Sequence, residues 1–128
     1  MDKIEFSHGQ FKFNDVRLDV RDGIKLYSTE DDVMEFMTVD DLRRFLDYYY
    51  EVMLNFFRGN KDRECYGTIM CMYKDDGNVM IWYDKREVRM EMSKVRCTYR
   101  FLKAITRKWE KYCKGGEWCL DEGFYALR

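Results

Sequence analysis

The sequence predicts an α+β fold in which one or more antiparallel sheets pack against two amphipathic helices. Three observations support this class. Two stretches of the chain share one pattern, each contains short segments of alternating apolar and polar residues, and each ends in a segment with helical spacing of apolar residues. We therefore expect a tandem strand–strand–strand–helix repeat. Its units span about residues 4–59 and 65–115 of a single compact domain, and a short C-terminal tail follows.

The repeat becomes visible when residues 24–38 are aligned with residues 79–93 at an offset of 55. After one inserted residue, the match continues from Arg44-Phe45-Leu46 to Arg100-Phe101-Leu102. Strand, turn, strand and helix positions match in the same order, which favours a duplicated structural unit. The other matched pairs are Ile24 and Val79, Leu26 and Ile81, Tyr27 and Trp82, Val33 and Val88, Met37 and Met92, Thr38 and Ser93, Tyr49 and Ile105, Met53 and Trp109, and Gly59 and Gly115.

The strands of the first unit are predicted from alternation and from turn residues. Apolar residues alternate over residues 11–20 with a break at Asn14-Asp15, which indicates either one bulged strand or two strands. Asp22-Gly23 predicts a hairpin turn, because glycine tolerates a positive φ. Further strands are expected at residues 24–27 and 33–37.

The helix of the first unit has clear start and stop signals. Thr38 is a suitable N-cap for a helix that begins at Val39, with Asp40 and Asp41 in its first turn. Gly59 is expected to end it. The apolar face is formed by Val39, Leu42, Phe45, Leu46, Tyr49, Met53, Phe56 and Phe57.

The second unit repeats this order. Residues 75–78 have the composition of a tight turn, and Ser93 is the expected N-cap of a helix that runs to about Cys113 and ends at Gly115-Gly116. Residues 117–128 carry several large apolar groups, so we expect this tail to pack back on the fold. The strands are expected at residues 67–73, 79–83 and 88–92.

Composition excludes several classes of protein. The chain has 128 residues, of which 46% are apolar and 17% aromatic, and this is ample for a hydrophobic core. There is no apolar run near 18 residues and no apolar segment at the N-terminus, so we expect a cytoplasmic protein that makes no use of a membrane. Residues 1–64 carry a net charge of −5 and residues 65–128 a net charge of +4.

The sequence contains no catalytic or metal-binding signature. The cysteines lack C-x-x-C spacing, and His8 is the only histidine, so we expect thiols in a reducing compartment, no metal and no cofactor. Phosphate-binding glycine motifs are absent, and a metal-dependent nuclease would require carboxylates that converge. We therefore predict that the protein is not an enzyme. The cysteines are Cys65, Cys71, Cys97, Cys113 and Cys119.

A basic stripe on the second helix is the first candidate binding surface. At 100° per residue, its basic residues lie opposite its apolar residues. Such a stripe is compatible with a solvated helix face, with binding of nucleic-acid phosphates, or with an acidic protein partner. Lys85 and Arg89 extend the basic region toward the strands. The stripe consists of Arg96, Arg100, Lys103, Arg107, Lys111 and Lys114.

Aromatic residues in the strands are the second candidate. Tyr73, Trp82 and Tyr83 would stack on nucleic-acid bases if they lay on an exposed sheet face. In the alternative interpretation, they fill the core beneath the helices.

The order of strands followed by a capped helix, in residues 33–57 and again in 88–113, resembles the PC4-like and whirly single-stranded-DNA-binding proteins. The segment most similar to them is Met34-Glu35-Phe36-Met37-Thr38, which leads into Val39-Asp40-Asp41-Leu42. The resemblance implies a curved sheet backed by helices, whose sheet face holds single-stranded nucleic acid. It implies no role for any individual residue.

These observations favour a non-enzymatic nucleic-acid-binding protein, most consistent with single strands. The alternative is a small protein-interaction module, such as a phage-type inhibitor or an immunity-like protein that binds a host protein. An acidic or nucleic-acid-binding protein would then be the partner. Two internal units can satisfy each other in a monomer, and unprotected sheet edges are equally compatible with a homodimer.

Overall fold

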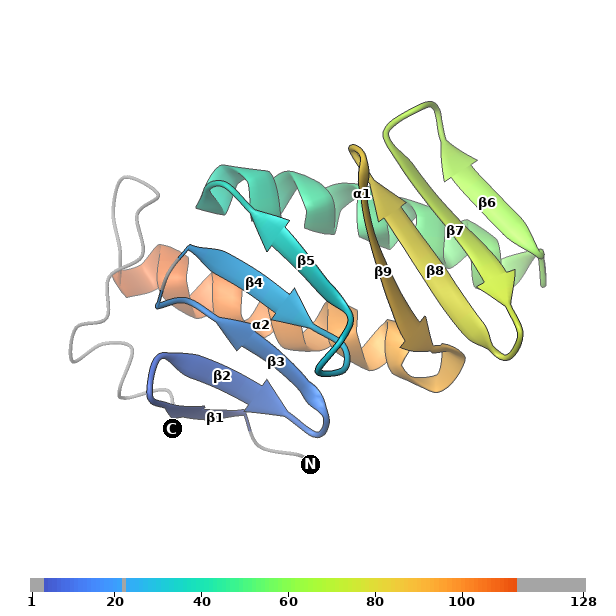
Figure 1. The fold of residues 1–128 in the computed structure, drawn as a ribbon. Coiled ribbons are helices and arrows are strands. Elements are labelled where there is room, and N and C mark those ends of the chain that lie inside the picture. Colours follow the sequence, from blue (N-terminus) through green and yellow to red (C-terminus); the bar gives the residue numbers. More distant parts are fainter. Residues whose placement is uncertain (1–3, 22, 113–128) are drawn as a thin grey trace.

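A computed structural model describes residues 4–21 and 23–112, with side chains in the last helix as far as Arg107. It contains two antiparallel sheets and two helices, which confirms the predicted α+β class (Figure 1). Sheet A consists of β1 (Glu5–Ser7), β2 (Gln10–Phe13), β3 (Val16–Asp19), β4 (Ile24–Tyr27) and β5 (Val33–Phe36), and is followed by α1 (Val39–Arg58). Sheet B consists of β6 (Arg63–Tyr66), β7 (Met70–Asp75), β8 (Asn78–Tyr83) and β9 (Arg86–Glu91), and a 3₁₀ turn (Met92–Lys94) leads into α2 (Val95–Tyr112).

Each sheet is a meander with one buried face, because alternate side chains of a strand point to opposite sides. In sheet A, the cross-strand row of Phe11, Leu18, Leu26 and Met34 is buried. The neighbouring row, which includes Lys12, Arg17 and Tyr27, lies on the opposite face and is exposed or half-buried. The register therefore separates a core face from an open face.

The helices are exchanged between the two units. α1 follows sheet A but packs against β6 and β7 of sheet B. α2 follows sheet B and runs behind sheet A, where Phe101 stacks on Phe13 of β2 with ring centres 5.8 Å apart (Figure 1). The two helices also contact each other. Buried residues of both units consequently form one hydrophobic core.

Polar contacts join the two sheets where β5 and β9 lie side by side. The Ser28 hydroxyl donates to the carbonyl of Arg89. Arg86 donates to the carbonyl of Glu35 at 2.8 Å and forms a 2.6 Å ion pair with Asp41. These contacts link residues more than forty positions apart, so they fix the placement of one unit on the other.

The predicted start and end of the first helix are confirmed. α1 begins at Val39, and the Thr38 hydroxyl accepts a 3.1 Å hydrogen bond from the Asp41 amide. At the other end, the Gly59 amide donates to the Asn55 carbonyl at 3.1 Å.

The strand count differs from the prediction. Residues 11–20 form two strands, which was one of the two predicted alternatives, and Asn14 adopts a positive φ of 54° in the turn between them. The predicted strand at residues 67–73 is a turn followed by β7, and β6 precedes it. β1 and β6 lie at sheet edges and are short, and β6 carries only a weak apolar signal, which explains why alternation did not reveal them.

Two local predictions for the second unit are wrong. Ser93 does not cap a helix, because it lies inside the 3₁₀ turn that precedes α2. Cys65 and Cys71 are not free thiols, because they are opposite each other on β6 and β7 and form a disulfide. Cys97 is a free, half-buried thiol. The expected helix end at Gly115-Gly116 and the packed tail at 117–128 fall outside the described residues.

Candidate nucleic-acid interface

The basic stripe is present on the outer face of α2. Arg96, Arg100 and Arg107 are exposed and Lys103 is half-buried, whereas Leu102 on the other side of the helix is fully buried. None of the four basic side chains forms an ion pair with another described residue. The four charges extend over twelve residues, or about 16 Å of helix. Among the side chains that the structure describes, this face therefore concentrates positive charge without an ion-pair partner.

One end of the stripe is anchored by an aromatic contact. The guanidinium carbon of Arg96 lies 4.4 Å from the centre of the Phe57 ring on α1. Such a cation–π contact holds the side chain in place and leaves its charge available. Arg96 therefore combines a defined position with an exposed positive charge.

A cleft rich in tyrosine lies beside the stripe, where α1, α2 and β6 meet. Its volume is about 600 Å³. Tyr50 and Tyr66 are 44% and 49% exposed, so aromatic surface is open to solvent in this cleft. Lys103 belongs both to the stripe and to this cleft. The tyrosine cleft is lined by Asp47, Tyr48, Tyr50, Glu51, Tyr66, Tyr99 and Lys103.

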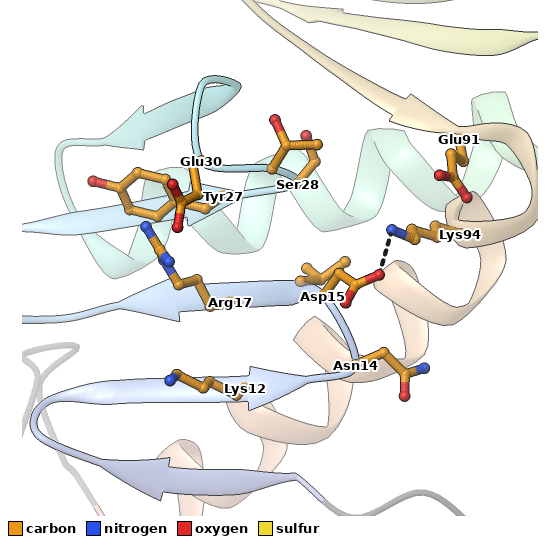
Figure 2. Close-up of a pocket in the computed structure, with 11 residues that line it drawn as sticks. Lys12, Asn14, Asp15, Arg17, Tyr27, Ser28, Glu30, Glu91 and Lys94 are labelled. Carbon is orange, nitrogen blue, oxygen red and sulfur yellow. Dashed lines mark hydrogen bonds and ion pairs between the residues drawn. The ribbon is translucent and has the colours of Figure 1, made fainter.

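A second cleft, of about 480 Å³, opens on sheet A next to the start of α2 (Figure 2). Arg17 of β3 lies over the ring of Tyr27 at 4.3 Å, and its buried Nε has no hydrogen-bond partner in the structure. At the other end of the cleft, Lys94 pairs with Asp15 at 3.1 Å. Glu30 and other acidic residues line the cleft together with Arg17 and Lys94, so the cleft carries charges of both signs.

The open face of sheet B holds two of the three predicted stacking residues. Tyr73 and Trp82 are half-buried there and line a shallow pocket beside Arg63. The Tyr73 hydroxyl donates to Glu87 at 2.7 Å, which raises the pKa of Tyr73. Tyr83 points to the other face and is only 3% exposed, so its ring is not accessible to a base.

Tyr83 has a structural role instead. Its ring packs edge-on against Phe45 of α1, and its hydroxyl donates to Asp41. Burial, followed by the charge of Asp41, raises the pKa of Tyr83 to about 12. The hydroxyl consequently stays protonated and donates this hydrogen bond at neutral pH.

The predicted basic residues do not form a single surface. Lys85 lies in the turn between β8 and β9, at the opposite end of β9 from α2. Arg89 lies on the open face of sheet B, where it pairs with Asp75 at 2.8 Å. The side chain of Lys111 and all of Lys114 fall outside the described residues. Four of the eight residues are thus shown to share the α2 face.

Sequence reasoning missed the tyrosine cleft. Its tyrosines come from three separate elements, so no local pattern joins them. One signal was available within α1. Tyr49 fits the buried helical face, and Tyr50, one residue or 100° further round, falls outside that face. A large aromatic residue at such a position indicates either a surface site or a contact with another element.

Carboxylates do not gather into a metal site. Among the residues that the structure describes, no group of three or more His, Cys, Asp or Glu side chains could hold a metal ion. Asp15 shares its cleft with Glu30 and Glu91, but Lys94 neutralises it there. In the part of the chain that the structure covers, neither helix has the length and apolar character needed to cross a bilayer.

Comparison of the chain with protein-family models, with curated proteins and with solved structures finds no match.

Proposed function

We propose that this protein is a non-enzymatic nucleic-acid-binding protein, and that the outer face of α2 contacts the phosphates. The observation that carries the proposal is the set of four basic side chains on one helix face with no carboxylate partner among the described residues. Like charges spaced at i,i+4 repel each other, so a helix face that only needs solubility normally mixes signs. The phosphates of a polyanion would offset this repulsion, and each phosphate contact would also release condensed counterions, which favours binding.

The test is fluorescence anisotropy of a labelled poly-pyrimidine single strand at several salt concentrations. Four phosphate contacts predict a slope of about −2.8 in a plot of log affinity against log salt, since each contact on a single strand contributes about −0.7. Affinity should then fall about 50-fold between 50 and 200 mM salt.

Two charge reversals locate the site. Arg100→Glu should weaken binding and make the salt slope shallower by at least about 0.7. Lys85→Glu changes the net charge by the same amount at an exposed position remote from α2, and should have little effect. Equal losses in both variants would show that net charge, rather than the α2 face, governs binding. Absence of binding at low salt would refute the proposal.

A second candidate function, a protein-interaction module, is favoured by one apolar patch. Met37, at the end of β5, is 88% exposed, and neighbouring Val33 is 37% exposed. Together with Lys85 they line a groove between the two sheets. Asp41, in the first turn of α1, pairs with Arg86 and is not available to a partner. Co-purification with one protein that survives nuclease treatment and is lost in Met37→Glu would support this function.

We also propose a cytoplasmic location, which can be tested through the Cys65–Cys71 disulfide. Thiols are kept reduced in the cytosol and disulfides are rare there, so the redox state of the Cys65–Cys71 pair inside the cell tests this location. Rapid alkylation of intact cells followed by mass spectrometry measures this directly. A fully oxidised pair in the cell would argue against the cytoplasm.

A further inference from the structure

We propose that the tyrosine cleft between α1 and α2 holds unpaired bases, so that the ligand is a single strand whose phosphates follow the basic stripe and whose bases stack beside it. This inference rests on the proposed function and specifies its ligand. The proposed binding surface therefore lies on the helical layer of the molecule, not on the open sheet faces.

The tyrosines of the cleft are held in place by other rings. Tyr99 lies 5.7 Å from the buried Tyr49 and 5.3 Å from Tyr50. Tyr48 bridges the exposed Tyr66, at 5.1 Å, and the buried Tyr83, at 6.3 Å. Each exposed ring thus contacts a half-buried ring, which in turn packs against a buried one. Rigid aromatic groups present contact area at low entropic cost, and base stacking on such rings is tolerant of sequence.

The cleft and the stripe are continuous. Lys103 lines the cleft and stands between Arg100 and Arg107 on the stripe. Partial burial raises the pKa of Tyr99, with further contributions from Tyr50 and Asp47, and the charge of Arg107 opposes them. A tyrosine hydroxyl is uncharged at neutral pH even at its ordinary pKa, so Tyr99 does not repel a phosphate. A nucleic-acid strand laid along α2 would place its phosphates on the basic side chains of the stripe and its nucleobases toward α1.

The carboxylates of the cleft favour the same orientation. Asp47 and Glu51 line the α1 side, where they would repel phosphates. Carboxylates accept hydrogen bonds from exocyclic amino groups of bases, as from cytosine N4. Phosphates on the α2 side and base edges on the α1 side match this separation of charge. A duplex keeps its bases paired and stacked inside the helix, so it cannot fill the cleft in this manner.

The open face of sheet B fits this role less well. Arg89 is neutralised by Asp75, and the Tyr73 hydroxyl is bonded to Glu87. Among the described residues, Arg63 is the single basic side chain that lines the pocket of Tyr73 and Trp82. Its aromatic residues therefore lack an adjoining row of unpaired charges. Trp82 on this face supplies the matched comparison for the experiment.

The experiment measures binding of a labelled poly-pyrimidine single strand, and of a duplex of equal length, to the wild type, Tyr50→Leu and Trp82→Leu. We expect the wild type to prefer the single strand. Tyr50→Leu should weaken single-strand binding by about 5- to 150-fold, the range for loss of one stacked base, with an unchanged salt slope because the phosphate contacts remain. Trp82→Leu should leave single-strand binding unchanged.

Several results would overturn the inference. Equal affinity for single strand and duplex, with no effect of Tyr50→Leu, would leave the proposed phosphate-binding function intact and remove the cleft from it. Loss of binding in Trp82→Leu alone would show that the nucleobases bind on sheet B and not in the tyrosine cleft. Absence of any binding would refute both proposals. Ultraviolet crosslinking of the wild-type complex followed by peptide mass spectrometry is independent of any folding defect. Crosslinks at Tyr50, Tyr66 or Tyr99 support the inference, and crosslinks confined to sheet B contradict it.

Discussion

Arg86 is the side chain whose replacement should damage the fold most among the charged residues that the structure describes in ion pairs. It lies on β9 and forms two contacts with the Asp41 carboxylate, of 2.6 and 3.2 Å. It also donates to the carbonyl of Glu35 on β5. The side chains of Arg86 and Asp41 are only 22% and 15% exposed. One guanidinium therefore connects sheet B with both sheet A and α1.

The magnitude follows from what Arg86→Met would leave behind. Removing one member of a fully buried ion pair costs about 3–5 kcal/mol, because the other charge loses its partner. Asp41 would keep its hydrogen bonds from the Met37 amide and the Tyr83 hydroxyl and has some access to water. We therefore expect the free energy of unfolding to fall by about 2–3 kcal/mol, or roughly 8–12 °C in Tm for a chain of this size. Methionine preserves the packing of the apolar stem.

Urea denaturation monitored by circular dichroism measures this loss, with Arg89→Met as the matched control. Arg89 is an arginine of the same strand, but its pair with Asp75 is exposed, with side chains 48% and 43% accessible. Exposed pairs contribute about 0–1 kcal/mol, so the control should stay within that range. Equal losses of stability in Arg86→Met and Arg89→Met would refute the role assigned to Arg86 as the link between sheet B, sheet A and α1.

The pH dependence of stability provides a second test of the ion pair between Arg86 and Asp41. Burial alone would raise the pKa of Asp41, but hydrogen bonds from Arg86 and the Met37 amide, with the charge of Arg86, outweigh it and lower the pKa. A carboxyl whose pKa is lowered on folding contributes stability above its ordinary value of 3.8, and this contribution is lost as the pH falls through the folded pKa. The difference in stability between wild type and Arg86→Met should therefore shrink below about pH 4.

Three further predictions concern local contacts. Thr38→Ala removes the N-cap of α1 and should cost about 1 kcal/mol in urea denaturation, whereas Thr38→Ser should cost much less. Asp19 has a pKa of about 2, because hydrogen bonds from Arg21 outweigh the opposing effect of burial. It should contribute about 2 kcal/mol above pH 4 that disappears as the pH falls toward 2, and Asp19→Asn should remove this part of the acid dependence. Reducing the Cys65–Cys71 disulfide, which closes a short loop, should lower stability by about 2 kcal/mol, and Cys71→Ser should make the protein insensitive to the reductant.

The sequence was most informative where a structural rule is local. Thr38 could be identified as a cap because capping depends only on the residues next to it. The same rule failed at Ser93, since the chain enters α2 through a 3₁₀ turn and the only signal used was the residue type. β6 could not be predicted, because three of its four residues are exposed at a sheet edge and carry no apolar alternation.

The residues of the candidate site also fall into those that a local rule could place and those that it could not. Helical periodicity placed Arg96, Arg100, Lys103 and Arg107 on one face, because all four belong to one helix. It could not show that Arg89 points to the opposite side of the molecule, since that depends on which face of sheet B the helices cover. Nearness in sequence was therefore a poor guide across the turn from β9 to α2.

The exchange of helices explains why the tyrosine cleft escapes any local pattern and why the two units depend on each other. α1 buries its apolar face against β6 and β7, so the first unit alone would leave that face exposed. The Tyr49 hydroxyl donates to the carbonyl of Val95, the first residue of α2, and this bond exists only when both units are in place. The seam between α1 and α2 is therefore a product of the complete fold. A ligand that bridges the two helices binds the folded chain and not the unfolded chain, and at a concentration of 100 Kd it would add about 2.7 kcal/mol to the stability of the fold.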